Sequence, residues 1–239
     1  MTNALARKSL AEFVGTALLV AAVIGSGIAA QRLSPTDVGL QLFENTAATA
    51  AALVAIILAL GAVSGAHLNP VVTLVDRVLG GLTNGEAAVY VTSQIFGGAL
   101  GAMIANLMFD EAAVTWSTHH RATGAHFLGE IVATFGLVLV VFGVVRSGRA
   151  SAAPFAVAAY IAAAYWFTSS TSFANPAVTL ARTLSNTFAG IAPSSAPAFV
   201  AAQVVGGGLG LACVVALYPG IAAAADDVVL PHRSEERNR

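Results

Sequence analysis

Six runs of about 20 mostly apolar residues follow one another along this chain, and they constrain its fold more than any other feature. A helix rises about 1.5 Å per residue, so each run can cross the hydrocarbon layer of a bilayer, which is roughly 30 Å thick. Apolar residues make up 57% of the chain and charged residues only 10%, whereas a soluble domain has about 25% charged residues. The sequence therefore predicts an all-α protein in a lipid bilayer, with spans at roughly 10–30, 46–63, 87–108, 126–146, 152–169 and 197–218.

The charges between the spans predict how the chain is oriented. Cations gather before the first span, in the loop "RSGRAS" between the fourth and fifth spans, and at the end of the chain, whereas the opposite loops carry fewer. Because cytoplasmic loops are the richer in Lys and Arg, both termini are predicted to be cytoplasmic. Arg7, Lys8 and "GIAAQ" resemble a cleaved signal peptide, but Glu12 and an internal copy of the first run at 127–145 argue against one.

The charges and motifs of the chain argue against several classes of function. The net charge of -1 gives no basic surface for nucleic acid. Cys213 is the only cysteine in the sequence, so no intramolecular disulfide or cysteine-built metal site is available. The sequence has no Gly-x-Ser-x-Gly, phosphate-binding or dinucleotide motif, which argues against an enzyme and a bound cofactor. A metal site is conceivable beside the third and fourth spans, but no closed ligand set is readable and a solvated loop is favoured for Asp110, Glu111, His119, His120 and His126.

The two halves of the chain are related by an internal repeat. The block "LAEFVGTALLV" at 10–20 matches "LGEIVATFGLV" at 128–138, and "SQIFGGALG" at 93–101 matches "AQVVGGGLG" at 202–210. These blocks occur in the same order around an Asn-Pro pair in each half, which indicates a duplication. Because each half has an odd number of spans, the second half enters the membrane from the opposite side and the repeats are inverted.

The repeat predicts the domain organisation and the helix contacts. We expect a single membrane domain over 1–239, with one repeat at about 8–110, a second at about 124–219 and a cytoplasmic tail at 220–239. Small residues let helix backbones approach closely in lipid. The matched glycines are therefore predicted to lie at helix contacts: Gly97, Gly98, Gly101, Gly206, Gly207 and Gly210.

An Asn-Pro pair lies inside an apolar segment of each half, at Asn69-Pro70 and at Asn175-Pro176. Asn is a favoured N-cap and Pro a favoured first helical residue, so each pair predicts a helix start. About ten apolar residues follow each pair, or ~15 Å of helix, which is half of a bilayer. Non-helical backbone is tolerated at this depth only where protein buries it or water contacts it. Two re-entrant half-helices would therefore bring both Asn side chains and both positive helix ends together at the membrane centre.

Such a centre favours the passage of a small neutral solute. Backbone carbonyls of "VSGAHL" and "TSSTSFA" would supply acceptors, and the two Asn amides would supply donors. A cation would meet two positive helix ends and a desolvation cost that no carboxylate offsets. An ion-coupled secondary transporter is the alternative, although such proteins place an ionisable residue at the midplane, whereas Glu12 and Glu130 lie near the starts of spans.

The paired Asn-Pro boxes on inverted repeats, with Glu12 and Glu130 early in each half, resemble the aquaporin and aquaglyceroporin family of major intrinsic proteins over about residues 8–219. The resemblance implies six transmembrane helices, two re-entrant half-helices, a pore in each subunit of a homotetramer, and a multi-pass location such as the bacterial inner membrane. It implies that Glu12 and Glu130 accept hydrogen bonds from the re-entrant loops and that the carbonyl of His67 faces the pore. The boxes at the pore centre would comprise Asn69, Pro70, Val71, Asn175, Pro176 and Ala177.

The second box departs from the family pattern, which runs Asn-Pro-Ala-Arg. By spacing, the four selectivity-filter positions are Thr49, Ala163, Ser172 and Val178, so Val178 replaces the arginine. These small residues predict a wide outer constriction without the fixed positive charge. The predicted function is thus passive passage of water, glycerol-like polyols and, by analogy, neutral arsenic or other metalloid species, with a strict water channel as an alternative.

Arg182 follows Asn175 by seven residues and could supply the missing charge. It shares a helix face with Asn175 but lies ~10 Å further along the half-helix. This position favours a structural role or a place at the mouth of the pore, because long cationic side chains reach for interfaces. Phe127 and Phe173 could narrow the outer vestibule.

Overall fold

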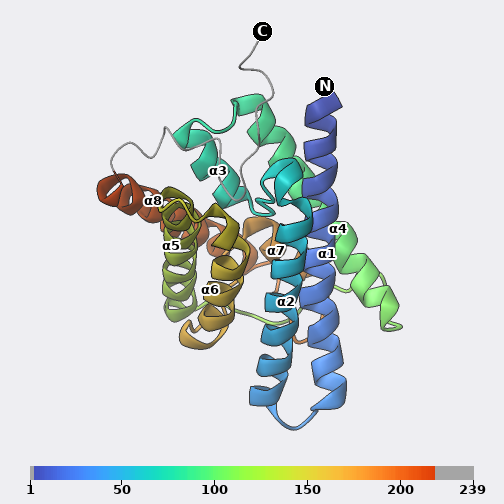
Figure 1. Cartoon of the computed structure of the whole chain (residues 1–239). Coiled ribbons are helices and arrows are strands. Elements are labelled where there is room, and N and C mark those ends of the chain that lie inside the picture. The colour runs from blue at the N-terminus through green and yellow to red at the C-terminus, as the bar shows by residue number, and fades with distance from the viewer. Residues whose placement is uncertain (1–2, 219–239) are drawn as a thin grey trace.

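The computed structural model describes residues 3–218 (Figure 1). Six helices in this part of the chain are long and apolar enough to cross a membrane. The predicted tail at 220–239, and residue 219 at the end of the predicted second repeat, lie outside the described residues. The elements are α1 (Asn3–Leu33), α2 (Val38–Ser64), α3 (Pro70–Leu79), α4 (Asn84–Met108), α5 (Gly124–Arg146), η1 (Ala150–Ala152), α6 (Ala153–Phe167), α7 (Pro176–Ala181), η2 (Arg182–Leu184) and α8 (Ala196–Leu217).

The six predicted spans are confirmed, but α1 and α2 begin well before the predicted apolar runs. An apolar run measures the part of a helix that lies in lipid, whereas the helix itself continues until a cap ends it. For α2, that cap is the side chain of Asp37, which accepts a hydrogen bond from the Leu40 backbone N–H at 2.9 Å. Gly65 ends α2 in a left-handed conformation, with φ of 85°, which glycine adopts without strain.

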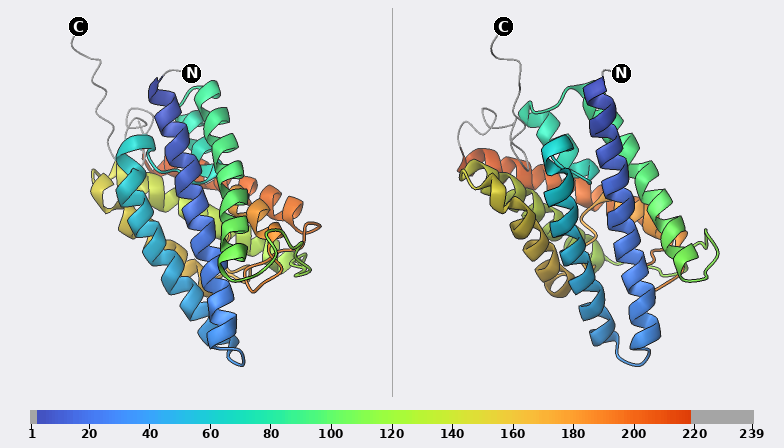
Figure 2. Two further views of the ribbon diagram at one scale, coloured as in Figure 1. Left: turned by 90° about the vertical axis from the view of Figure 1, so that its right-hand side faces the viewer. Right: turned by 45° about the vertical axis from the view of Figure 1, so that its right-hand side comes forward.

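The two halves of the molecule pack in the same way. Helix α1 packs against α2 and α4, and α5 packs against α6 and α8. Figure 1 shows that α1 and α5 run in opposite directions, as inverted repeats require. Each half-helix also crosses to the other half, because α3 contacts α8 and α7 contacts α4. Figure 2 shows α3, in teal, near the end of the bundle where α1 begins, and Figure 1 shows α7 nearer the middle. The half-helices therefore interlock the two repeats.

The matched glycines of α4 and α8 allow close contact with the first helix of each half. A Cβ added to Gly97 would overlap the carbonyl oxygen of Phe13 on α1, and one added to Gly206 would overlap that of Ile131 on α5. The next glycines, one helical turn further along α4 and α8, make the equivalent contacts: Gly101 packs against α1 and Gly210 packs against α5. Each pair of helices therefore approaches to backbone contact, which a side chain would prevent.

The remaining glycine of each set contacts a half-helix instead. A Cβ at Gly98 would lie 3.3 Å from the carbonyl oxygen of Ala177 on α7, and one at Gly207 would overlap the side chain of Val71 on α3. Gly98 therefore faces the half-helix of the second repeat, and Gly207 that of the first. Small residues at these positions let α4 and α8 seat the half-helices at the centre of the bundle.

Substituting Gly97 by Ala should destabilise the protein, because the new methyl group would collide with backbone that cannot move independently of α1. Overpacking of this kind costs about 1–3 kcal/mol. The measurement is the temperature at which detergent-solubilised protein loses its monodisperse peak in size-exclusion chromatography. Gly208→Ala on α8, the counterpart of α4 in the second repeat, is the control, since nothing lies within 4 Å of its added Cβ. An equal effect of the two substitutions would contradict the packing role of Gly97.

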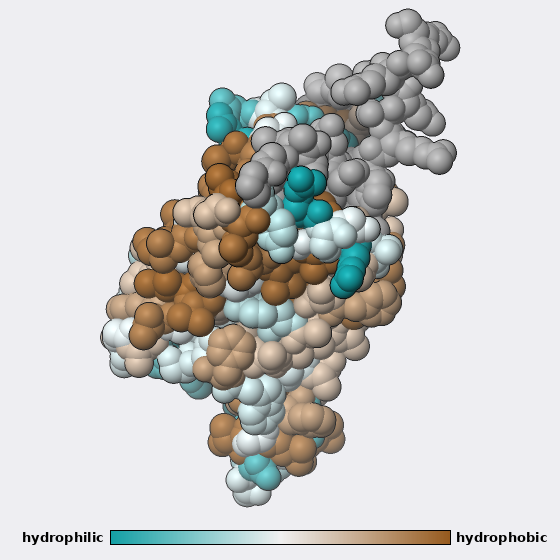
Figure 3. All heavy atoms as spheres, turned by 60° about the vertical axis from the view of Figure 1, so that its left-hand side comes forward, coloured by the Kyte–Doolittle hydropathy of each residue, from teal (hydrophilic) through white to brown (hydrophobic). Residues whose placement is uncertain are grey.

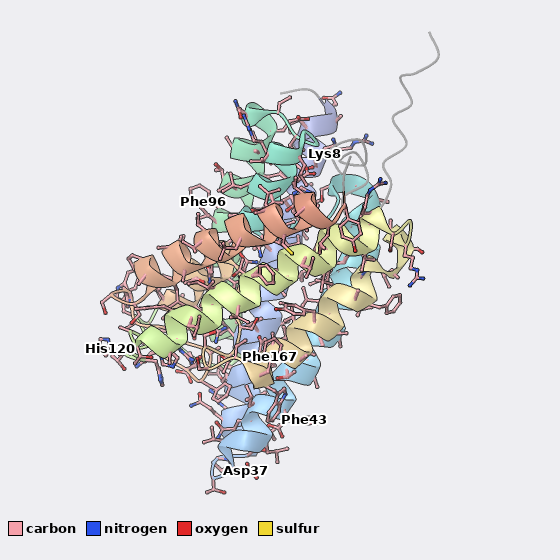
Figure 4. All side chains as sticks on the ribbon, turned by 90° about the vertical axis from the view of Figure 1, so that its left-hand side faces the viewer. Lys8, Asp37, Phe43, Phe96, His120 and Phe167 are labelled. Carbon is pink, nitrogen blue, oxygen red and sulfur yellow. The ribbon has the colours of Figure 1, made fainter. Side chains whose placement is uncertain are left out.

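The outside of the bundle is apolar between two polar ends. Figure 3 shows brown, hydrophobic residues over much of one face, with teal residues toward the ends. Large apolar side chains project outward, including Phe43, Phe96 and Phe167, which are 59%, 64% and 56% exposed (Figure 4). Figure 4 also places Lys8 at one end of the molecule and Asp37 at the opposite end. This surface suits a bilayer, with the charged groups at its two faces.

Candidate pore

The two half-helices begin at the Asn-Pro pairs. The side-chain oxygen of Asn69 accepts from the backbone N–H of Val71 at 2.9 Å, and that of Asn175 accepts from the N–H of Ala177 at 3.0 Å and of Val178 at 3.3 Å. Both caps have extended backbone, with φ of -153° and -155°. Asn supplies the acceptor and Pro removes the one amide that would have no partner, so the local sequence is sufficient to start each helix.

The two caps also bind each other's loops. The side-chain amide of Asn69 donates to the carbonyl of Ala174 at 2.7 Å, and that of Asn175 donates to the carbonyl of Leu68 at 2.7 Å. This reciprocal pair brings the positive ends of α3 and α7 together at the centre of the bundle. Each amide carries a second N–H, and both Asn side chains line the central cavity. The centre therefore offers two N–H donors to a solute.

The loops before the caps follow an unusual backbone path. Ala66 and Leu68 in the first loop have φ of 46° and 50°, and their repeat counterparts Ser172 and Ala174 both have φ of 49°. Left-handed conformations cost a non-glycine residue roughly 1 kcal/mol or more, so something must hold them. The same conformation at matching positions shows that both loops are built on one plan.

Glu12 holds the first loop from α1. Its carboxylate accepts four hydrogen bonds, from the hydroxyl of Ser64 at 2.6 Å, the backbone N–H of His67 at 3.0 Å, the N–H of Leu68 at 2.7 Å, and the side-chain amide of Gln94 at 2.7 Å. Glu12 has no exposed surface. A deprotonated carboxylate is acceptor-only, so it satisfies all four donors in a place that water does not reach.

Glu130 holds the second loop in the same way. It accepts from the N–H groups of Phe173 and Ala174 at 2.9 and 2.8 Å and from the amide of Gln203 at 2.6 Å. Gln203 also donates to the hydroxyl of Thr179 at 2.8 Å, just as Gln94 donates to Thr73 in the first half. The sequence paired these glutamines by repeat alignment alone. The structure shows that they connect α4 and α8 to the loop supports.

His67 takes part through both its backbone and its ring. Its Nδ1 lies 3.2 Å from the hydroxyl of Thr73, and its Nε2 lies 3.8 Å from the carboxylate of Asp76, which is 2% exposed. The ring of Tyr90 lies 5.3 Å away, and His67 lines the cavity. The imidazole is thus oriented by buried polar groups on α3.

A cavity lies between the helices and is lined by both caps. One wall is apolar and comes mainly from α2, α5 and α6, whereas the polar atoms come from the two loops and their caps. Three of the four positions predicted for the filter line it, namely Thr49, Ser172 and Val178, and all are at most 5% exposed. The other lining side chains include Leu53, Ile57, Val72, Leu137, Val141, Val157, Ile161 and Tyr165.

The fourth position, Ala163, was predicted wrongly. Ala163 is exposed on α6, whereas Val157, Ile161 and Tyr165 line the cavity at intervals of four residues. Successive residues turn by about 100° in a helix, so Ala163 lies roughly 200° away from Ile161. The period of Val157, Ile161 and Tyr165 is the sequence feature that could have identified the lining face.

Tyr165 brings a large polar side chain to the outer part of the cavity. Its hydroxyl donates to the hydroxyl of Thr49 at 3.4 Å, which joins α6 to α2. The prediction of a filter made of small side chains alone is therefore wrong, because an aromatic ring lies where Ala163 was expected. The ring lies on the same lining as Ser172 and Val178.

The positive charge predicted to be missing is also present. Arg182 is 2% exposed, lines the cavity, and places its guanidinium carbon 3.4 Å from the centre of the Phe173 ring. Its Nε donates to the carbonyl of Ala189. The ring and this carbonyl hold Arg182 on the cavity wall. Phe173 lines the cavity, while Phe127 packs behind it against Phe199, so only the former narrows the vestibule.

A second guanidinium approaches Phe173 from the loop between α4 and α5. Arg121 lies 5.3 Å from the ring centre and donates to the carbonyl of Gly190 at 3.1 Å. Burial lowers the pKa of the Arg121 guanidinium, while the carboxylate of Glu130 acts in the opposite direction. No sequence motif pointed to Arg121, because its place depends on how this loop folds over η2.

The loop with several histidines packs over η2. Among residues 3–218, no group of three His, Cys, Asp or Glu side chains is placed to hold a metal ion. Burial, with the nearby charge of Arg121, lowers the pKa of His119, which favours a neutral imidazole. The backbone of this loop instead covers the second half-helix, since Thr115 and Ser117 donate their N–H groups to the carbonyls of Leu184 and Thr183.

Comparison with known proteins identifies the family. A family model described as "Major intrinsic protein" matches residues 1–171, which is more than half of the chain. The chain belongs to the major intrinsic protein family. The match ends before Asn175, so the part of this major intrinsic protein that departs from the Asn-Pro-Ala-Arg pattern lies beyond it.

Relatives and solved structures agree with this assignment. The aquaglyceroporin AqpS of Rhizobium meliloti is 49% identical over 213 residues, which cover 89% of each chain. The probable aquaporin AqpM of Archaeoglobus fulgidus is 33% identical over 171 residues, covering 63% of this major intrinsic protein and 70% of the relative. The X-ray structure of the aquaglyceroporin from Plasmodium falciparum matches with a TM-score of 0.66 at 18% identity, over 93% of this chain and 99% of that one, and so shows the fold.

Proposed function

We propose that this major intrinsic protein is a passive channel for small uncharged solutes, namely water and glycerol-like polyols. The observation that carries the proposal is the reciprocal pair of Asn caps. Asn69 and Asn175 each bind the opposite loop with one amide hydrogen and line the cavity, where the second is available to a solute. A hydroxyl group can accept from these amides as it passes, without a proton or an ion being exchanged.

The two walls of the cavity suit a polyol. Side chains such as Leu53, Ile57 and Val141 form an apolar wall for the carbon backbone, while the loops supply polar atoms for the hydroxyl groups. A solute with hydroxyl groups along one edge can keep its hydrogen bonds while it leaves water, so little desolvation cost remains. AqpS, which is 49% identical, is an aquaglyceroporin, and this likeness supports the same class of solute.

Neutral metalloid hydroxides are a further proposed cargo. A trivalent hydroxide such as arsenous acid is uncharged near neutral pH and, like glycerol, carries three hydroxyl groups. Val178, Thr49 and Ser172 contribute side chains no larger than that of Val to the lining, to which Tyr165 and Arg182 also contribute. We expect this region, together with Tyr165, to act as the selectivity filter.

The cellular setting follows from the surface and the family. The protein is a multi-pass integral membrane protein. We propose the inner membrane of a bacterium, with the end that carries Arg7 and Lys8 in the cytoplasm, because cations favour that side. We also propose a homotetramer, as the resemblance to aquaporins implies. Native mass spectrometry from detergent should then give four times the mass of 24.1 kDa.

Flux measurements in proteoliposomes test the channel. When glycerol is added outside the proteoliposomes, stopped-flow light scattering should show shrinkage by water loss and then rapid reswelling as glycerol enters. The reswelling rate should grow linearly with the gradient and should not depend on sodium or proton gradients. Water flux without reswelling would indicate a strict water channel instead. Saturable uptake that needs an ion gradient would indicate a secondary transporter, the other alternative.

A further inference from the structure

Arg182 has an unusual combination of burial and access. It is 2% exposed to solvent, yet it lines the central cavity one helical turn beyond Val178. Its Nε binds the carbonyl of Ala189, and its guanidinium stacks on Phe173. Among the described residues, no carboxylate forms an ion pair with it. Arginine keeps its charge inside proteins, so the cavity wall carries a positive charge.

The stacking fixes where this charge lies. A guanidinium is weakly hydrated and planar, so an aromatic face can hold it when water is excluded. Phe173 is in turn held by Phe199, at 5.2 Å between ring centres, and by its backbone N–H bond to Glu130. The terminal nitrogens of Arg182 have no hydrogen-bond partner among the described residues. They are therefore the part of the side chain that faces the cavity.

The first half of the molecule treats the equivalent position differently. Asp76 follows Asn69 by seven residues, as Arg182 follows Asn175. Asp76 is buried beside the His67 imidazole and does not line the cavity. The repeat therefore places an acidic and a basic group at symmetric sites but exposes only the basic one to the passage. This asymmetry gives the outer half of the cavity a net positive potential.

We infer that Arg182 is a specificity-determining residue that keeps protons and other small cations out of the passage, in place of a side chain at Val178. The inference deepens the proposed function, because it concerns what the same cavity rejects. A fixed charge inside a narrow passage with apolar walls acts strongly on an ion, since little water screens it. A neutral polyol feels no such barrier and can accept hydrogen bonds from the same nitrogens.

The experiment compares Arg182→Gln with Arg121→Gln. Glutamine keeps an amide donor for the nearby carbonyl at either site, so each variant removes charge while retaining the means to make the bond. Arg121 also lies against Phe173, but it does not line the cavity. Proteoliposomes that contain a trapped pH-sensitive dye are given a potassium diffusion potential, and proton entry is followed. Glycerol flux is measured on the same preparations.

Arg182→Gln should raise proton entry about tenfold or more over wild type, because the barrier is electrostatic. Glycerol flux should stay within about twofold, since glycerol is neutral. Arg121→Gln should leave proton entry close to wild type, and Arg182→Lys should restore the barrier by returning a charge.

Proton entry that does not rise in an Arg182→Gln variant that still assembles would overturn the inference. If that variant fails to assemble, Arg182→Met takes its place, because methionine keeps an apolar side chain against the Phe173 ring while removing the charge; unchanged proton entry would again overturn the inference. A wild type that conducts no glycerol would instead refute the proposed function, and the proton measurements would still decide the role of Arg182.

Discussion

Ile161→Trp should abolish glycerol flux, whereas Ala163→Trp should leave it close to wild type. Ile161 lines the cavity from α6, and Ala163 lies on the exposed face of the same helix. A Trp ring inserted into the lining would occupy space that a passing solute needs. On the exposed face, the same ring would lie outside the passage. The pair separates an effect on the passage from a general effect of adding Trp to α6.

The measurement is glycerol reswelling of proteoliposomes by stopped-flow light scattering, with equal amounts of each variant. We expect Ile161→Trp to fall by about a hundredfold, to the rate of empty liposomes, since a closed passage leaves only diffusion through lipid. Both variants must first elute as monodisperse protein, because an overpacked lining can destabilise the bundle. Equal flux through the two variants, or loss of flux in Ala163→Trp alone, would show that the lining face of α6 has been assigned wrongly.

Glu130→Gln should strongly destabilise the protein while Glu111→Gln should hardly affect it. The carboxylate of Glu130 accepts from two backbone N–H groups and from Gln203 in a fully buried place. The isosteric amide has one acceptor oxygen, and its NH₂ group must face a donor. Each buried donor left without a partner costs about 1–3 kcal/mol. Glu111 is half-exposed in an ion pair with Arg32, and such pairs contribute at most about 1 kcal/mol.

Thermal unfolding in detergent measures the difference. A loss of about 2–4 kcal/mol corresponds to a fall of roughly 5–15 °C in the midpoint for a protein of this size. Glycerol flux should fall as well, because Ser172 and Ala174 lose the support of their left-handed backbone. A midpoint that falls no further for Glu130→Gln than for Glu111→Gln would contradict the role of the Glu130 carboxylate as the acceptor for these donors.

Much of the architecture could be predicted because it depends on local features. The apolar length of each run gives a span, and Asn followed by Pro gives a helix start, whatever the rest of the chain does. The repeat then fixes which segments are equivalent, and the odd number of spans fixes their inversion. The structure has all six spans, and both half-helices begin at the expected residues, although α7 ends at Ala181 and the chain continues as the 3-10 helix η2 rather than as α-helix.

The composition of the lining could be predicted only in part. Thr49, Ser172 and Val178 line the cavity as predicted. Thr49 lies within a helix, and the other two lie three residues to either side of the Asn175 cap. Ala163 was located by its spacing in the family pattern, and a shift of two residues turns a helical side chain to the opposite face. Tyr165 was missed for the same reason. The place of Arg121 depends on the loop that covers η2, which has no periodic pattern to read.

The sequence by itself determined that this chain crosses a membrane in two inverted halves with an Asn cap at each half-helix. Helix length and capping are set by neighbouring residues, and the odd number of spans in each half can be counted along the chain. The tertiary structure alone decided the charge of the passage. Arg182 has a long side chain that can reach several environments, and only the packing of Phe173 and the carbonyl of Ala189 select the cavity wall. Groups far apart along the chain set that choice, so no local pattern records it.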